Sequence, residues 1–173
     1  MQKKFSYPVK IDELKQSDYK FLLKADAQEL VDIQQILQVE KVYDFCTDIR
    51  LKLDFRIHQL KVWGRVKTKL EVKSVISLEN FVQEIDTPFE LVFDTKASYQ
   101  DIRDMECSIN DDVPDIIENG CINLADIALE QAALKLDDYP RLEGETFDFG
   151  DYVQEPIITE EYHPFAVLAK LKK

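Results

Sequence analysis

Residues 50–73 (RLKLDFRIHQLKVWGRVKTKLEVK) carry the longest alternation of apolar and polar side chains in the chain. Successive side chains of a β-strand point to opposite faces of the sheet, so a period of two predicts strand. The alternation breaks around Gln59 and Leu60, and a connection of a few residues is too short to join parallel strands. The stretch therefore predicts an antiparallel hairpin, with strands over residues 50–58 and 61–73.

The two faces of this predicted hairpin differ in chemistry. One face collects apolar side chains, with Gly64 and Thr68 in the same phase: Leu51, Leu53, Phe55, Ile57, Val62, Val66, Leu70 and Val72. The other face collects charged and polar side chains: Arg50, Lys52, Asp54, Arg56, His58, Lys61, Trp63, Arg65, Lys67, Lys69, Glu71 and Lys73. The apolar face is expected to pack on a core, and the second face is cationic.

Positive charge gathers only in this hairpin. The whole chain has a net charge of −12, from 34 acidic and 22 basic residues. Residues 50–73 hold eight Lys and Arg against Asp54 and Glu71, a local charge of +6, which leaves −18 on the rest. Proteins that bind nucleic acid over their whole surface use a basic field, so that class is excluded. The pattern predicts an acidic protein with one basic face.

Two helices are predicted where capping residues precede apolar residues at helical spacing. Asp26 and Glu29 fit a capping box, in which each side chain accepts a hydrogen bond from the other residue's backbone amide. A helix over residues 27–38 follows. Asn123 is a second N-cap, before a helix over residues 124–136 whose polar stripe is narrow. The second helix is therefore expected to be the more buried.

Short strands are expected on both sides of these elements, at residues 4–9, 19–24, 81–86 and 89–94. The last two are predicted to pair around Thr87 and Pro88, and their acidic side chains could face the cationic strand. In that arrangement the basic face would be explained by exposed cross-strand ion pairs alone, each contributing only a few tenths of a kcal/mol.

The length of 173 residues fits a single domain over 1–173. Acidic segments near residues 94–119 and 142–161 lack periodicity and are expected to be loop-like excursions. A short amphipathic helix is predicted from Pro164 to the C-terminal lysines. The expected fold class is α+β: an antiparallel sheet, curling toward a half-barrel, with the two main helices on its apolar face.

No catalytic constellation emerges, so we expect a protein that is not an enzyme. His58 and His163 are interpreted as ordinary exposed residues, and three scattered cysteines, Cys46, Cys107 and Cys121, indicate free thiols in a reducing compartment. Neither metal-ligand spacing nor a glycine-rich phosphate loop is present, so no metal and no cofactor are expected. No apolar leader or membrane-spanning stretch is visible, which predicts a cytoplasmic protein without membrane partners.

Trp63 is the feature that points to a partner. This lone tryptophan shares a face with Lys61, Arg65 and Lys67, and single-stranded nucleic acids stack bases on aromatic rings while cations hold their phosphates. The alternative is that Trp63 packs under a helix or under the chain's own acidic segments. The candidate nucleic-acid-binding residues are Arg50, Lys52, Arg56, Lys61, Trp63, Arg65, Lys67, Lys69 and Lys73.

Five short motifs stand out: VWGRV at 62–66, SLENF at 77–81, GCINLADIALE at 120–130, DYPR at 138–141 and HPFAVLAKL at 163–171. Together they resemble the YceD family of bacterial and plastid proteins, in the form typical of alphaproteobacteria. The resemblance covers most of the chain from about residue 40. Many relatives carry cysteine where this chain has Ser74, and some also at Ser77, so a thiol or metal role of that pair does not carry over.

The resemblance implies a role in the accumulation of large-subunit ribosomal RNA, and no catalytic residues are known for the family. It leads to the hypothesis of a ribosome-biogenesis factor that protects or helps process precursor RNA of the large subunit, without contact to DNA. The alternative is an acidic binding module that holds a basic ribosomal protein by complementary charge, without touching RNA. An enzyme whose site the sequence does not reveal is the third hypothesis.

Overall fold

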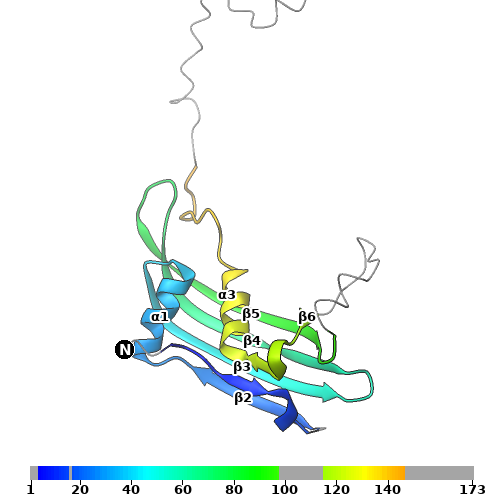
Figure 1. Ribbon diagram of the computed structural model, residues 1–173. Helices are drawn as coiled ribbons and strands as arrows, with labels where there is room; N and C mark the ends of the chain where they lie inside the picture. The colour runs from blue at the N-terminus through cyan, green and yellow to red at the C-terminus, as the bar shows by residue number, and fades with distance from the viewer. Residues whose placement is uncertain (1–3, 16, 98–114, 147–173) are drawn as a thin grey trace, which may run out of the picture. The chain divides into compact units, whose positions relative to one another are not determined.

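A five-stranded sheet dominates the computed structural model, which describes residues 4–15, 17–97 and 115–146. Its strand order is β2 (Asp18–Lys24), β3 (Lys41–Asp54), β4 (Gln59–Lys73), β5 (Asn80–Asp94) and β6 (Asp115–Ile116) (Figure 1). Neighbouring strands are antiparallel, except that β6 runs parallel to β5. A two-stranded sheet pairs β1 (Pro8–Lys10) with β7 (Cys121–Asn123). The chain divides into two units after Glu143, and these elements lie in the first.

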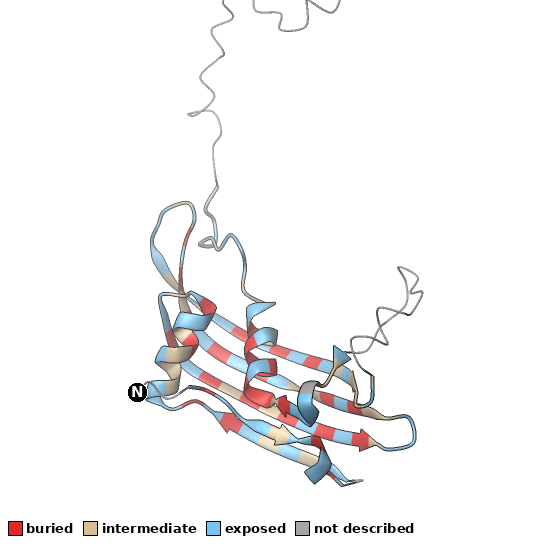
Figure 2. Cartoon of the chain, viewed as in Figure 1, coloured by how far each residue is buried: buried red, intermediate tan, exposed pale blue. Residues whose placement is uncertain are grey.

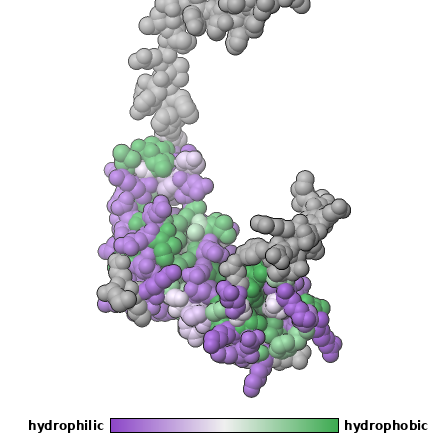
Figure 3. Space-filling view, viewed as in Figure 1, coloured by the Kyte–Doolittle hydropathy of each residue, from purple (hydrophilic) through white to green (hydrophobic). Residues whose placement is uncertain are grey.

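Two helices, α1 (Ala27–Leu37) and α3 (Leu124–Ala133), lie on the same side of the sheet (Figure 1). Helix α1 contacts β3, and α3 contacts β4 and β5. Buried residues of both helices belong to one hydrophobic cluster with the sheet, and buried and exposed residues alternate along the strands (Figure 2). In space-filling view, hydrophobic side chains remain visible between hydrophilic ones on this side (Figure 3). The α+β class and the mainly antiparallel sheet are confirmed, and curling toward a half-barrel stays a prediction.

The long alternation forms a hairpin, as predicted, but its turn lies elsewhere. Strand β3 ends at Asp54, and the turn occupies Phe55 to His58 rather than Gln59 and Leu60. The Asp54 carboxylate accepts a hydrogen bond from the Arg56 backbone amide at 2.9 Å, and His58 adopts a positive φ of 54°. An aspartate side chain that bonds to the backbone two residues further on stabilises a turn. The strand therefore ends at Asp54, although apolar and polar residues still alternate in the sequence up to His58. Phe55 and Ile57 are consequently exposed, and their predicted place in the apolar row is wrong.

Strand β5 was predicted as two strands turning around Thr87 and Pro88, and this is wrong. It is one strand of 15 residues, in register with β4 from end to end, including Arg65 opposite Pro88. Its other neighbour, β6, covers only Phe93 and Asp94. Proline lacks the amide proton that a central strand needs, but it is tolerated along an edge without a partner strand. The described part of the sheet provides that edge at Pro88.

Both predicted helix starts are confirmed. Asp26 accepts hydrogen bonds from the backbone amides of Gln28 and Glu29, and the Glu29 carboxylate accepts from the Asp26 amide, which completes the capping box. Asn123 accepts from the Ala125 amide at 3.2 Å and also from the Tyr7 amide at 2.7 Å. The same asparagine therefore starts α3 and holds the residue that precedes β1.

Helix α3 is the more buried of the two, as expected, and it ends at Ala133 rather than at residue 136. The short strand predicted at residues 4–9 is observed as β1, at Pro8–Lys10, and β2 begins one residue before the predicted 19. Most of the acidic segment at 94–119, most of that at 142–161 and the C-terminal helix from Pro164 lie outside the described residues. A single domain over 1–173 therefore stays a prediction.

Candidate nucleic-acid interface

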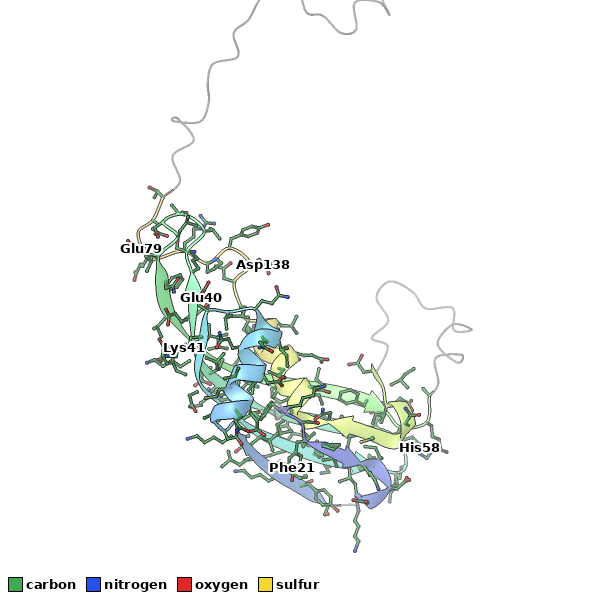
Figure 4. The ribbon with its side chains drawn as sticks, turned by 60° about the vertical axis from the view of Figure 1, so that its left-hand side comes forward. Phe21, Glu40, Lys41, His58, Glu79 and Asp138 are labelled. Carbon is green, nitrogen blue, oxygen red and sulfur yellow. The ribbon has the colours of Figure 1, made fainter. Side chains whose placement is uncertain are left out.

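The side chains of β2–β5 that point away from α1 and α3 form a surface that we call the polar face. Strand register aligns them in rows across four strands. Each of the four central rows has one residue from β2, β3, β4 and β5, in that order. The first row is Asp18, Lys52, Lys61 and Val92, and the second is Lys20, Arg50, Trp63 and Glu90. The third row is Leu22, Asp48, Arg65 and Pro88, and the fourth is Lys24, Cys46, Lys67 and Asp86. Figure 4 labels the two ends of the sheet, with His58 at the β3–β4 turn and Glu79 at the β4–β5 turn.

Cross-strand ion pairs connect β4 to β5 on this face. Lys61 Nζ lies 2.7 Å from a Glu90 carboxylate oxygen, and Lys69 Nζ lies 2.9 Å from Glu84. Asp86 pairs with two cations through different oxygens: Arg65 Nη1 at 2.7 Å and Lys67 Nζ at 3.2 Å. These side chains are about half exposed or more, so each pair contributes no more than about 1 kcal/mol to stability.

Strand β2 brings a second set of ion pairs to β3. Lys20 Nζ of β2 lies 3.0 Å from Asp48 Oδ2, and within β3 itself Arg50 Nε lies 4.0 Å from Asp48 Oδ1. Lys52 Nζ lies 3.8 Å from an Asp18 oxygen. Six of the nine predicted interface residues therefore have a carboxylate partner on a neighbouring position of the same face. The positive charges of these residues are therefore partly neutralised by carboxylates of the same sheet.

Charge nearly cancels over the polar face as a whole. Its exposed cations are Lys20, Lys24, Lys41, Arg50, Lys52, Lys61, Arg65, Lys67, Lys69 and Lys73. The carboxylates that share it are Asp18, Asp44, Asp48, Asp54, Glu71, Glu84, Asp86, Glu90 and Asp94. The excess of positive charge predicted from residues 50–73 alone is thus reduced, because β5, β2 and the first part of β3 supply acids that lie outside that stretch.

Hydrogen bonds on the polar face lower the pKa values of three carboxyl groups. The hydrogen bond from Lys69 lowers the pKa of Glu84 below its ordinary value. At Asp86 burial alone would raise the pKa, but hydrogen bonds from Lys67 and Arg65 outweigh it and the pKa is lowered. Tyr43 donates a hydrogen bond to Glu71, which lowers the pKa of Glu71 and raises that of the tyrosine. All three carboxylates are therefore ionised at neutral pH.

Trp63 lies at the centre of the polar face and is half-buried. Lys61 Nζ lies 5.9 Å from the centre of its indole ring, within range of a cation–π contact. The residue borders a shallow hollow of about 440 Å³, which we call the Trp63 depression. Its lining comes entirely from β2, β3 and β4: Leu22, Cys46, Thr47, Asp48, Arg50, Trp63, Gly64, Arg65 and Lys67. Three cations and one carboxylate therefore surround the depression, which makes it locally positive.

Helices α1 and α3 do not cover Trp63. They contact the opposite side of β3, β4 and β5, and none of their residues lines the Trp63 depression. Within the described ranges, therefore, the alternative of a helix packed over the tryptophan is not observed. Leu22, on the same face, is 74% exposed, an unusual position for a leucine in a strand.

Seven of the nine predicted residues come together across β3 and β4: Arg50, Lys52, Lys61, Trp63, Arg65, Lys67 and Lys69. Arg56 lies instead in the β3–β4 turn, and Lys73 lies at the far end of β4 opposite Asn80. Lys20, Leu22 and Asp48 also lie on this surface and were not predicted from the sequence. Strand β2 was predicted, but the pairing that places its side chains beside Arg50 joins residues about 30 positions apart and left no local signal.

Other reactive side chains in the described part of the chain are dispersed. His58 lies in the β3–β4 turn, Cys46 on β3 and Cys121 on β7, both cysteines as free thiols. Burial, followed by the nearby Asp44 charge, raises the pKa of the Cys46 thiol, so it is protonated at neutral pH and a poor nucleophile. Neither described helix is long and apolar enough to cross a membrane.

These features define a class: an α+β protein whose mainly antiparallel sheet has one face covered by helices and one charged face that they leave open. The chain belongs to the YceD family, since the family model described as large ribosomal RNA subunit accumulation protein YceD matches residues 62–172. The match begins within β4, at residue 62, and includes all of β5 and α3 but neither β2 nor β3. No curated protein and no solved structure matches the chain.

Proposed function

We propose that this protein is a non-enzymatic ribosome-biogenesis factor that supports accumulation or processing of large-subunit ribosomal RNA by binding precursor RNA through the polar face. The family description supports the link to large-subunit ribosomal RNA. One observation of the molecule carries the RNA contact: the Trp63 depression, where Arg50, Arg65 and Lys67 surround an indole ring that neither described helix covers.

Ion pairing on the polar face limits how this binding works. Cations already held by carboxylates gain less from a phosphate, because the existing pair must be loosened first. Binding therefore relies on the locally positive Trp63 depression more than on the nearly neutral face as a whole. Stacking on an aromatic ring supplies free energy that salt does not screen. We expect moderate affinity with a shallow salt dependence.

Neutralising three cations together tests the proposal: Arg65→Gln, Lys67→Gln and Lys69→Gln in the full chain, with transcripts of large-subunit precursor RNA. Loss of up to three phosphate contacts should flatten the plot of log affinity against log salt for single-stranded RNA, by at most about 2 units. A matched control neutralises Lys4, Lys10 and Lys15, which lie outside the polar face. An unchanged slope, or an equal change in the control, would overturn the mechanism.

A second candidate is the binding module for a basic ribosomal protein. A hollow of about 450 Å³ lies at the C-terminal ends of α1 and α3, and its charged lining residues are three carboxylates, Glu40, Asp137 and Asp138, and one cation, Lys73. Neither helix has a basic residue in its last turn, so both negative dipole ends add to these carboxylates. This function predicts that a basic ribosomal protein co-purifies with the chain and is released by high salt but not by ribonuclease.

A further inference from the structure

We propose that the Trp63 depression binds one unpaired nucleobase that carries an amino group, stacked on Trp63 and hydrogen-bonded to Asp48. The inference rests on the proposed function, and it adds which part of the RNA is recognised and which chemical edge of the base is read. Three features of the depression carry it: an aromatic wall, a carboxylate with free acceptor capacity, and flanking cations.

The aromatic wall suits a flat ligand. Trp63 forms one side of the depression and the exposed Leu22 lies on another, with strand β3 between them. A base stacked on the indole would remove apolar surface of both side chains from water. The bases of a duplex are already stacked on one another and cannot enter such a depression, so the site favours single-stranded RNA.

Asp48 supplies the specificity. It pairs in register with Arg65, two residues along β4 from Trp63, so it is a diagonal neighbour of the tryptophan on the same face, roughly 7 Å away. That separation is comparable with the width of a base. A carboxylate accepts hydrogen bonds and cannot donate them, so it favours a base edge with an amino donor, such as that of cytosine, over the carbonyl edge of uracil.

The acceptor capacity of Asp48 is not used up by its ion pairs. Lys20 contacts Oδ2 at 3.0 Å, whereas Arg50 Nε lies 4.0 Å from Oδ1, beyond hydrogen-bonding distance. Arg50 therefore leaves the lone pairs of Oδ1 available to a base. The positive charges of Arg50, Arg65 and Lys67 around the depression can meet the phosphates that flank a bound nucleotide.

The test uses the lone tryptophan as a reporter in the full chain. Oligocytidylate and oligouridylate of about eight nucleotides carry equal charge and differ at the base edge that Asp48 would contact. Both should quench Trp63 fluorescence, whereas an RNA duplex should not. The unmodified protein should bind oligocytidylate about fivefold more tightly than oligouridylate, as expected for one net hydrogen bond.

Two variants separate stacking from edge recognition, with binding followed by a label on the RNA. Asp48→Ala should bring the ratio of the two affinities close to one, and this ratio is insensitive to the change in overall charge. Trp63→Ala should weaken both oligonucleotides by roughly tenfold or more, and Trp63→Phe, which keeps a stacking ring, should restore much of the binding. Leu22→Ala, outside the cationic set, checks the opposite wall with a smaller loss.

Equal affinities for the two oligonucleotides in the unmodified protein, or RNA binding without quenching of Trp63, would overturn this inference. The proposed function would survive that result if precursor RNA still bound with a salt slope that depends on Arg65, Lys67 and Lys69. Failure of precursor RNA to bind at all would overturn both. A preference for cytidylate that persists in Asp48→Ala would show that another group reads the base, which also contradicts the proposal.

Discussion

The two faces of the five-stranded sheet arise from the same alternation of side chains, but one is buried under the helices and the other is exposed and charged. On the helix side, Phe45, Ile49, Leu51, Val62 and Val66 are fully or almost fully buried, and the hydrophobic effect rewards each of them. On the polar face, side chains from the same strands are exposed and joined by ion pairs that contribute little to folding. Stability is therefore concentrated on one face, so substitutions on the polar face should cost little folding free energy.

The largest effect should come from the buried face. Phe45 is fully buried, and its ring meets that of Phe5 edge to face at 5.4 Å. Phe45→Ala removes these contacts and leaves a cavity, so the free energy of unfolding should fall by about 3–5 kcal/mol in urea titrations. Phe55→Ala is the matched control, since that ring is 49% exposed, and should cost less than about 0.5 kcal/mol. Similar losses in both variants would refute the division between faces.

An intermediate effect is expected at Gly64, where the backbone of β3 leaves no room for a side chain on β4. A Cβ atom added there would lie 2.1 Å from the backbone oxygen of Asp48, so Gly64→Ala forces the two strands apart. Unfolding free energy should drop by about 1–3 kcal/mol, as for other overpacked sites. Amide hydrogen exchange should quicken along β3 and β4. A gain in stability, the usual result of replacing glycine where space allows, would contradict the close approach.

The smallest effect belongs to the polar face. The pKa of Glu84 is lowered by Lys69, so its contribution to stability is present above the ordinary carboxyl value of 4.5 and is lost as pH falls through the lowered pKa. Glu84→Gln should therefore lower the urea midpoint slightly at neutral pH, and the difference from the unmodified protein should vanish in acid. Glu79→Gln, at the β4–β5 turn, provides the control. A difference that grows on acidification would show that the sign is wrong.

Local signals in the sequence predicted the elements that local interactions determine. Asp26 with Glu29 and Asn123 mark the two helix starts, because a capping side chain bonds to amides only two or three residues away. Alternation placed Leu51, Val62, Val66 and their neighbours on the buried face. Trp63 was assigned to the polar face by the same count, and the strand register confirms that assignment.

Features of the polar face that depend on pairing between strands far apart in the sequence could not be predicted from local patterns. The carboxylates that form ion pairs with Lys61 and Lys69 come from β5, whose continuity through Pro88 follows from an edge that no local pattern reveals. One cross-strand neighbour of Arg50, Lys20, comes from β2, which precedes β3 in the chain by a helix and two connections. The +6 charge counted in the hairpin therefore overstated the field at the surface. RNA binding by the predicted residues stays a prediction.

Ultraviolet crosslinking of the full chain in living cells, followed by identification of both the RNA and the crosslinked peptide, tests the central claim most directly. The account predicts precursor RNA of the large ribosomal subunit attached to the β4 peptide that contains Trp63, and loss of that crosslink in Trp63→Ala. The control triple variant at Lys4, Lys10 and Lys15 should crosslink normally. Recovery of a basic ribosomal protein without RNA, or of RNA attached to α1 or α3, would contradict it.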